Sequence, residues 1–477
     1  MKIRTLKLQA LALLFALTSF MALAQNRDIT ILAVNDMHAS IDRFPKFVAL
    51  VDSMRTLYPD LLLFAAGDNR TGNPANDMYP ISSYPMTTLM NKAGFNLSAV
   101  GNHEFDGNID GLRTVLNGAN FRHVCANMYA PDSMRLHIEP YKIFEIDGVR
   151  IGVLGLIQQG ANKLPDAHPN NLKNIAFRPL DQVAKQYSWL RDQCDVFVLL
   201  VHEGYDESIL LTNQYPLPDV IISGHSHTPV QTTELHNGVL ITQAGSSLKY
   251  VTYITLQLTD GKVTKKESAL LDVNAFLRSD ADIQVMVDDF NNDESLLREV
   301  VQVSADFTCY EELGSMMTDA IRIETGADIA LQNPGGVRFE TFPKGPMTVR
   351  DIYRLDPFNN NVIEFSLTGE EILRLIKAAY IAENKQAPYI SGATYEMELD
   401  KQDEIKKLQV KMNNGAKLDP QKKYKVVMNS YLSAVSQYQK TDEGKDLFRT
   451  SASMTIDYLE KQPAIDYNGV KRVILKQ

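Results

Sequence analysis

The chain of 477 residues contains little cysteine and only one tryptophan, and its histidines are unevenly distributed. Its three cysteines, Cys125, Cys194 and Cys309, permit at most one disulfide and do not have the spacing of a thiolate metal site. We therefore expect buried, chemically inert thiols. All nine histidines lie in the first half, because His236 is the last one. Histidine chemistry is thus expected only in the N-terminal part of the chain.

Positive charge is also scarce, since 48 lysines and arginines stand against 58 aspartates and glutamates, a formal net charge of −10. Such acidity disfavours nucleic-acid duplexes and anionic membranes as partners, so a bound phosphate needs local cations or metals. The N-terminus combines Lys2, Arg4 and Lys7 with an apolar stretch that ends in the letters ALA before Gln25. This layout is typical of a secretory signal peptide, and we expect cleavage after Ala24.

Loss of these three positive charges takes the formal charge from −10 to −13. No cysteine near the cleavage point could carry a lipid, so we predict an exported protein, periplasmic or extracellular, without a membrane anchor. The length predicts two or three domains. An acidic, helix-like stretch around residues 265–300 lies within the histidine-free part. We expect a signal peptide, a first domain, a helical linker and a second domain at 1–24, 25–280, 281–300 and 301–477.

Five apolar runs in the first half end abruptly in residues that can bind a metal. They read DITILAVNDMH, LLLFAAGDN, FNLSAVGNHEFD, DVFVLLVHEG and DVIISGHSH. Helix-like stretches such as FPKFVALVDSMRTL separate them, which predicts an α/β fold class with strands buried on both faces. Because ligands gather beyond the carboxyl ends of such strands, we expect these polar residues to meet in one site.

The strand ends supply seven candidate metal ligands: Asp36, His38, Asp68, Asn102, His202, His225 and His227. This mixed nitrogen and oxygen set is too large for one tetrahedral zinc. It suits two adjacent divalent ions, zinc, manganese or a similar metal, bridged by a carboxylate such as that of Asp68. The other histidines lack a strand-end position and are expected to be structural or on the surface: His123, His137, His168 and His236.

The motifs NDMH, AGDNRTG, GNHEFD, LVHEG and GHSH follow the order found in two-metal calcineurin-like phosphoesterases. Nearly all of the mature chain resembles the secreted 5′-nucleotidase and UDP-sugar hydrolase family. The resemblance implies a layered α/β metallophosphoesterase sandwich followed by a second α/β (α+β) substrate-binding domain. It assigns one metal to Asp36, His38, Asp68 and His227, and the other to Asp68, Asn102, His202 and His225.

The same resemblance implies that His103 and Asp106 are the catalytic pair. The imidazole of His103 would face the substrate phosphate, and the Asp106 carboxylate would orient it and keep it protonated. In the second domain, the segments NPGGVR, DPFNNN and NSYLSAV match substrate-binding segments of the family. The matching residues are Asn333, Arg338, Phe358 and Tyr431.

The chain departs from the family pattern at two places. Cys309 and Tyr310 stand where the family has an arginine, and Gln437 lies near the position of an aspartate in a lost Gly-Gly-Asp-Gly loop. In the family that aspartate contacts the base, so its loss bears on substrate choice.

We predict an exported, two-metal-dependent phosphohydrolase that cleaves phosphate monoesters, with 5′-nucleotides favoured, through hydroxide formed from water on the metals. The sequence leaves other substrates open, namely nucleotide sugars, 2′,3′-cyclic nucleotides or another phosphoester. A catalytically silent ligand-binding protein is the alternative from a different class. The sequence favours no oligomeric state.

Overall fold

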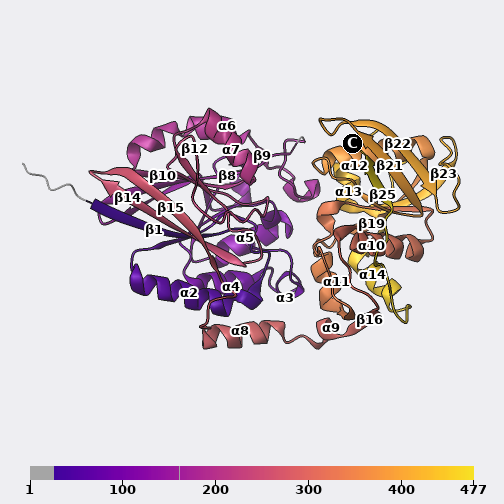
Figure 1. Ribbon diagram of the computed structural model, residues 1–477, viewed down its shortest axis with the longest axis horizontal. Coiled ribbons are helices and arrows are strands. Elements are labelled where there is room, and N and C mark those ends of the chain that lie inside the picture. Colours follow the sequence, from indigo (N-terminus) through magenta and orange to yellow (C-terminus); the bar gives the residue numbers. More distant parts are fainter. Residues whose placement is uncertain (1–25, 161, 477) are drawn as a thin grey trace, which may run out of the picture.

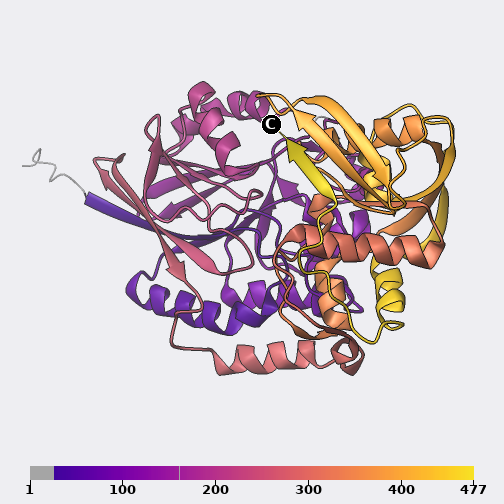
Figure 2. The same cartoon turned by 45° about the vertical axis from the view of Figure 1, so that its right-hand side comes forward.

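Two α/β domains lie side by side in the computed structural model, which describes residues 26–160 and 162–476 (Figures 1 and 2). The signal peptide expected at residues 1–24 lies outside the described residues. Along the lower edge of Figure 1 the chain passes from one domain to the other through α8 (Ala281–Asn291), α9 (Glu294–Leu297) and β16 (Glu299–Val303). We propose that this segment links the domains.

Two β-sheets form the centre of the N-terminal domain, in the orders β15-β14-β1-β2-β3-β4-β6 and β12-β13-β11-β10-β8-β7. The strands of the first are β1 (Asn26–Val34), β2 (Leu62–Ala65), β3 (Leu97–Ala99), β4 (Arg122–Val124), β6 (Ile138–Glu139), β14 (Tyr250–Thr259) and β15 (Lys262–Asp272). Those of the second are β7 (Tyr141–Ile146), β8 (Val149–Ile157), β10 (Val196–His202), β11 (Val220–Ile222), β12 (Glu234–His236) and β13 (Val239–Thr242). A short pair, β5 (Met128–Tyr129) and β9 (Ala176–Phe177), stands apart.

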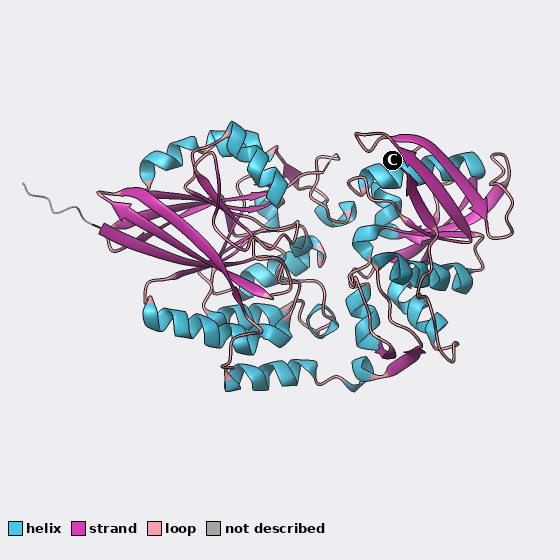
Figure 3. Ribbon diagram, viewed as in Figure 1, coloured by secondary structure: helices cyan, strands magenta, loops and turns pink. Residues whose placement is uncertain are grey.

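The two sheets pack face to face, and helices cover their outer faces (Figure 3). Apolar residues from both sheets, such as Phe64 and Val198, meet in the central core. A second core lies under the helices α2 (Phe44–Leu57), α4 (Tyr84–Ala93) and α8, and a third under α6 (Leu180–Gln186) and α7 (Tyr205–Gln214). Strands with both faces covered explain the continuous apolar runs.

The sequence of α2 shows how this layering arises. Its residues Phe44, Phe47, Val48 and Val51 recur at helical spacing and are all buried against the first sheet. Pro45 lies in the first turn, where a missing N–H costs little. The shorter helices α3 (Pro74–Asp77) and α5 (Asn108–Gly118) complete this domain near the strand ends.

The C-terminal domain has a sheet in the order β20-β17-β23-β19-β24 and a smaller one in the order β22-β21-β25, beside the pair β16-β18. Its further strands are β17 (Ile329–Gln332), β18 (Gly345–Thr348), β19 (Asn361–Thr368), β20 (Tyr389–Ser391), β21 (Ala393–Leu399), β22 (Ile405–Met412), β23 (Lys423–Asn429), β24 (Lys445–Thr450) and β25 (Val473–Lys476). Its helices are α10 (Tyr310–Thr325), α11 (Val349–Leu355), α12 (Gly369–Ala382), α13 (Ser430–Val435) and α14 (Ser451–Leu459).

This arrangement confirms the predicted α/β fold class with two unlike domains. The expectation about the cysteines was wrong in one respect: Cys125 and Cys194 are buried, but Cys309 is exposed just before α10. All three are free thiols. Among the described residues, no helix combines the length and apolar character needed to cross a membrane.

Candidate active site

The predicted metal ligands follow the carboxyl ends of five strands. Asp36 and His38 come after β1, Asp68 after β2 and Asn102 after β3, while His202 ends β10. His225 and His227 follow β11. Since β1, β2 and β3 run parallel, as do β10 and β11, their ends meet at one edge of the two sheets.

Several of these residues adopt a backbone conformation that L-residues rarely use. Their φ angles are 46° at Asp36, 46° at His38, 53° at Asp68, 81° at His225 and 57° at His227. Each such residue costs about 1–3 kcal/mol and persists only where surrounding structure imposes it. Five of the seven candidate ligands share this left-handed backbone, which agrees with a functional site at this sheet edge.

One group of candidate ligands surrounds Asp36. Its Oδ1 atom is buried and accepts no hydrogen bond from the described residues. Three imidazoles approach that oxygen: Nε2 of His227 lies at 3.3 Å, and those of His38 and His202 at 3.9 Å. Nε2 of His38 is also 3.1 Å from Nε2 of His227. A buried carboxylate oxygen ringed by imidazole nitrogens is a donor set that fits a divalent transition metal.

A second group lies around Asp68. Its Oδ2 atom is 3.0 Å from Nε2 of His202, which is itself 3.1 Å from Oδ1 of Asn102. Asp68, His202 and His225 bring one ligand atom each within 4.8 Å of one another, and Asp68 makes a similar group with His38 and His103. Asp68 therefore belongs to both of these candidate groups.

The charges of this cluster shift its pKa values. Burial lowers the pKa of His202, but the carboxylates of Asp68 and Asp36 outweigh it and raise that pKa to about 10. Burial raises the pKa of Asp68, yet His202 and His103 bring it well below the usual range. These carboxylates hold positive charge tightly, and a divalent cation can replace the protons that the imidazoles otherwise carry.

His103 and Asp106 form a direct pair beside these ligands. Nδ1 of His103 is 2.7 Å from Oδ2 of Asp106, and its Nε2 lies 3.8 Å from Oδ2 of Asp68. Burial lowers the pKa of His103, but the charges of Asp68 and Asp106 prevail, so the pKa is raised. The ring is therefore biased towards imidazolium, and its Nε2 lies on the side of Asp68.

Glu104 is a structural residue of the site that the sequence reasoning missed. Its buried carboxylate accepts hydrogen bonds from the backbone N–H groups of Asp68 at 2.9 Å, Asn69 at 2.8 Å and Gly101 at 2.7 Å. It thus ties the loop after β2 to the loop after β3. A Cβ atom on Gly101 would overlap Oδ1 of Asp68, so this approach requires glycine. The motif GNHEFD contains Glu104, but only the fold reveals its partners.

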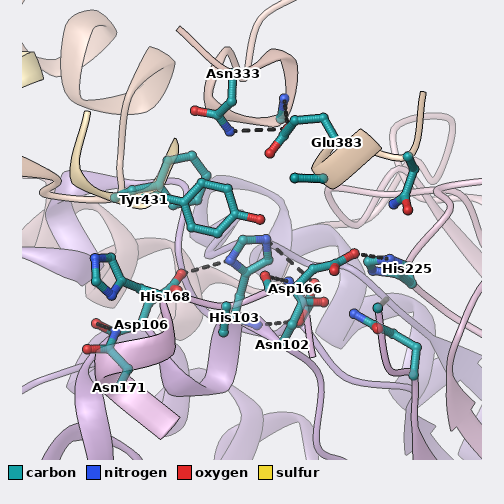
Figure 4. Close-up of a pocket in the computed structure, with 18 of the residues that line it drawn as sticks. Asn102, His103, Asp106, Asp166, His168, Asn171, His225, Asn333, Glu383 and Tyr431 are labelled. Carbon is teal, nitrogen blue, oxygen red and sulfur yellow. Dashed lines mark hydrogen bonds and ion pairs between the residues drawn. The ribbon is translucent and has the colours of Figure 1, made fainter. Parts of the chain in front are cut away.

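All four predicted substrate-binding residues line one cavity together with His103. This cavity, of about 1050 Å³, lies between the two domains. Figure 4 shows Asn333 and Tyr431 on one side of it and His103 and Asp106 on the other. Nη2 of Arg338 lies 3.0 Å from Nε2 of His38, and the Phe358 ring stacks on His103. The structure thus brings the residues chosen in both domains to one place.

Further residues of the cavity gave no signal in the sequence. Asp166 lies 3.3 Å from Nε2 of His225, and its backbone oxygen accepts a 3.0 Å hydrogen bond from Asn102. His168, expected to be structural or on the surface, also lines the cavity, as does Glu383 after α12. Gln437 is exposed and bonds to the Ala434 carbonyl oxygen at 3.2 Å. It does not replace the lost aspartate.

Two family models match this protein, one in each of the two domains. Residues 29–229 match the calcineurin-like phosphoesterase family, and residues 298–441 match the 5′-nucleotidase C-terminal domain. The chain is a calcineurin-like phosphoesterase with a 5′-nucleotidase C-terminal domain. Such an enzyme is a metal-dependent phosphoester hydrolase, and the match confirms the resemblance predicted from the sequence motifs.

The relatives of this phosphoesterase are distant. It is 26% identical over 464 residues to Endonuclease YhcR of Bacillus subtilis, covering 86% of this chain but only 37% of that protein. It is 25% identical over 515 residues to a 5′-nucleotidase of Vibrio parahaemolyticus, covering 92% of this chain and 90% of the other. A 5′-nucleotidase precursor from Thermus thermophilus shares the fold, with a TM-score of 0.82, 23% identity and coverage of 94% of this chain and 99% of that one.

Proposed function

We propose that this phosphoesterase uses two divalent metal ions to hydrolyse phosphate monoesters, with 5′-nucleotides as substrates and nucleosides and phosphate as products. The observation that carries the proposal is the shared cavity, where four candidate ligands and His103 lie together with Arg338, Phe358 and Tyr431. The four ligands are Asp68, Asn102, His225 and His227. One domain offers the chemistry for a phosphoryl group, and the other offers aromatic rings for a base.

In this proposal Asp36, His38, Asp68 and His227 hold one ion, and Asp68, Asn102, His202 and His225 hold the other. The ions supply Lewis-acid polarisation of the phosphoryl group and activation of a water molecule. Asp106 keeps the His103 imidazole oriented through the 2.7 Å contact. His103 Nε2 then donates to a phosphoryl oxygen, where negative charge increases in the transition state, and can protonate the leaving oxygen.

Arg338 and Phe358 act on the substrate from the second domain. The Arg338 guanidinium lies 3.0 Å from Nε2 of His38, next to a residue of the proposed metal site, and would bind the phosphate of a substrate held there. A guanidinium can donate two parallel hydrogen bonds to such oxygens. Phe358 and Tyr431 offer ring faces for stacking, which is worth about 1–3 kcal/mol per base.

Phosphate release from a substrate panel tests this proposal. The panel contains the four 5′-nucleotides, a nucleotide sugar, a 2′,3′-cyclic nucleotide and 4-nitrophenyl phosphate, with manganese or zinc supplied. We expect 5′-nucleotides to have the highest kcat/KM. Replacement of His103 by alanine should lower kcat by about 100- to 1,000-fold while the metal content, measured by elemental analysis, stays at two ions per chain.

A panel in which 4-nitrophenyl phosphate or the cyclic nucleotide dominates would refute the nucleotidase assignment. The loss of the base-contacting aspartate, with Gln437 outside the cavity, makes these other phosphoesters the second candidate substrates. Metal content below one ion per chain after incubation with zinc or manganese would instead favour a ligand-binding protein without catalysis.

We further propose export to the periplasm or the exterior, on the basis of the charged and apolar pattern of residues 1–24. N-terminal sequencing of the protein recovered outside the cytoplasm should begin at Gln25. An intact N-terminus on the recovered protein would refute cleavage.

A further inference from the structure

Glu383 is a buried carboxyl group that the proposed mechanism does not use. It caps the C-terminal end of α12, its exposed fraction is 9%, and it lines the cavity between the domains. Its Oε1 atom has no hydrogen-bond partner among the described residues. A buried acceptor left without a partner destabilises a fold by about 1–3 kcal/mol, so this oxygen requires an explanation.

The other oxygen of Glu383 has only weak partners. Oε2 lies 3.4 Å from Nδ2 of Asn333 and 3.4 Å from the backbone nitrogen of Gly335. Both distances are at the long limit for hydrogen bonds. No lysine or arginine forms an ion pair with Glu383 within the described ranges, and Asp166 is a nearby negative charge. The carboxyl group is therefore poorly compensated inside the protein itself.

Neighbouring amides fix which oxygen of Glu383 contacts Asn333. Oδ1 of Asn333 accepts hydrogen bonds from Nδ2 of Asn429 at 2.8 Å and from Nε2 of Gln332 at 3.3 Å. This turns the Asn333 amide nitrogen towards Oε2 of Glu383. Oε1 is left as an acceptor for a group that enters the cavity.

The surroundings of Glu383 indicate what that group is. Figure 4 shows Glu383 and Tyr431 on the same side of the cavity. The Glu383 charge contributes to the raised pKa of the Tyr431 phenol, after the larger effect of burial, so the two groups are electrostatic neighbours. A ring face beside an edge acceptor is the combination by which proteins bind an unpaired base, through stacking and hydrogen bonds to its edge.

We propose that Glu383 is a specificity-determining residue whose Oε1 accepts a hydrogen bond from an N–H group of the nucleobase. This inference rests on the proposed nucleotidase function and adds how the base is recognised. The exocyclic amino groups of adenine, guanine and cytosine, and the ring N–H of guanine and uracil, are suitable donors. A ribose hydroxyl has the same donor chemistry, and the experiment separates the two.

The first test varies the substrate of the wild-type enzyme and needs no mutation. The kcat/KM for AMP is compared with that for N6,N6-dimethyl-AMP, whose exocyclic nitrogen has no hydrogen to donate. We expect the methylated nucleotide to be hydrolysed about 10- to 100-fold less efficiently, because the hydrogen bond to the Glu383 carboxyl group is lost. Equal kcat/KM values for the two nucleotides would overturn the proposal that the exocyclic amino group of adenine donates to Glu383.

The second test compares Glu383→Gln with Glu404→Gln, the same change at an exposed carboxylate outside the cavity. For Glu383→Gln we expect about a 10- to 100-fold loss in kcat/KM on AMP, GMP and CMP, and a much smaller loss on ribose 5-phosphate and 4-nitrophenyl phosphate. Thermal unfolding checks that both variants are folded.

A Glu383→Gln loss on ribose 5-phosphate equal to that on nucleotides would assign the contact to the ribose or to the scaffold and overturn the inference. If the wild type prefers nucleotides and Glu383→Gln keeps that preference, this inference fails while the nucleotidase function stands. If the wild type hydrolyses 4-nitrophenyl phosphate but no nucleotide, the proposed function fails and this inference fails with it.

Discussion

The ring of Phe358 lies almost parallel to the imidazole of His103, with 5.5 Å between the ring centroids and 24° between their planes. The two residues come from different domains. The Arg338 guanidinium lies 5.7 Å from the centre of the same Phe358 ring and also contacts His38. Side chains of the second domain therefore cover the histidine that we propose as the catalytic residue.

Replacement of Phe358 by alanine should raise KM for 5′-nucleotides by about 5- to 100-fold, because a stacking face worth about 1–3 kcal/mol per base is lost. Steady-state kinetics on AMP measure this change. Phe358→Tyr is the matched control, since it keeps the ring and should stay close to the wild type. An equal rise of KM on 4-nitrophenyl phosphate would contradict a role in binding the base.

Replacement of Arg338 by lysine should lower kcat/KM by about 10- to 100-fold, although the charge is kept, because an ammonium group cannot donate the two parallel hydrogen bonds of a guanidinium. Kinetics on AMP and elemental analysis of bound metal are measured together. The metal content should not change. A fall in bound metal would instead mean that Arg338 supports His38 rather than the phosphate.

Replacement of Glu104 by glutamine should weaken the site without removing a candidate ligand side chain. One acceptor oxygen becomes an amino group that faces backbone N–H donors, which costs about 1–3 kcal/mol of the free energy of unfolding. Metal affinity should fall by about 10- to 100-fold, which is typical when a residue that orients metal ligands through hydrogen bonds is replaced. Urea unfolding and metal titration measure the two effects, with Glu404→Gln as the exposed control. Unchanged metal affinity would count against this role.

Protonation of the buried His123 should destabilise the folded protein in acid, and this effect does not involve the proposed metal site. Burial lowers the pKa of this imidazole to about 4, against an ordinary value of 6.5. Between those two pH values the unfolded chain binds a proton at this position and the native state does not. The free energy of unfolding therefore falls as pH falls from 6.5 to 4, by roughly 3 kcal/mol from this residue.

His123→Phe should remove this contribution, because phenylalanine keeps the ring that contacts Phe121 and has no group to protonate. Urea unfolding at pH 7, 5.5 and 4 gives the change of the free energy of unfolding with pH for the wild type and for His123→Phe. The same change at the exposed His137, His137→Phe, is the control. If the free energy of unfolding of His123→Phe falls with pH as steeply as that of the wild type, other groups cause the acid sensitivity.

The features predicted from the sequence are those that neighbouring residues along the chain reveal. Apolar runs that end in Asp36, Asp68 and His202 predicted buried parallel strands, which the structure confirms. The metal site at their ends stays a prediction, supported by candidate ligand groups. Both predictions were possible because strand type and ligand type are read along the chain. Glu104, Asp166 and Glu383 carried no such signal, since each acts on residues far away in sequence. The exposure of Cys309 was missed because thiols are most often buried, whereas this one lies at a helix start on the surface.

The loops that carry the ligands are fixed by the protein's own hydrogen bonds. Glu104 joins two of them, and Asn35 joins a third to the Gly245 carbonyl oxygen at 2.6 Å and to the Asp36 carboxylate. Hydrogen bonds within the protein thus hold the left-handed turns at Asp36 and Asp68. In zinc fingers, capture of the ion and folding of the chain are a single event. Because these loops also have hydrogen bonds of their own, we expect the two events to be separate here: a chelator should remove bound metal and leave an ordered protein that can accept a different metal.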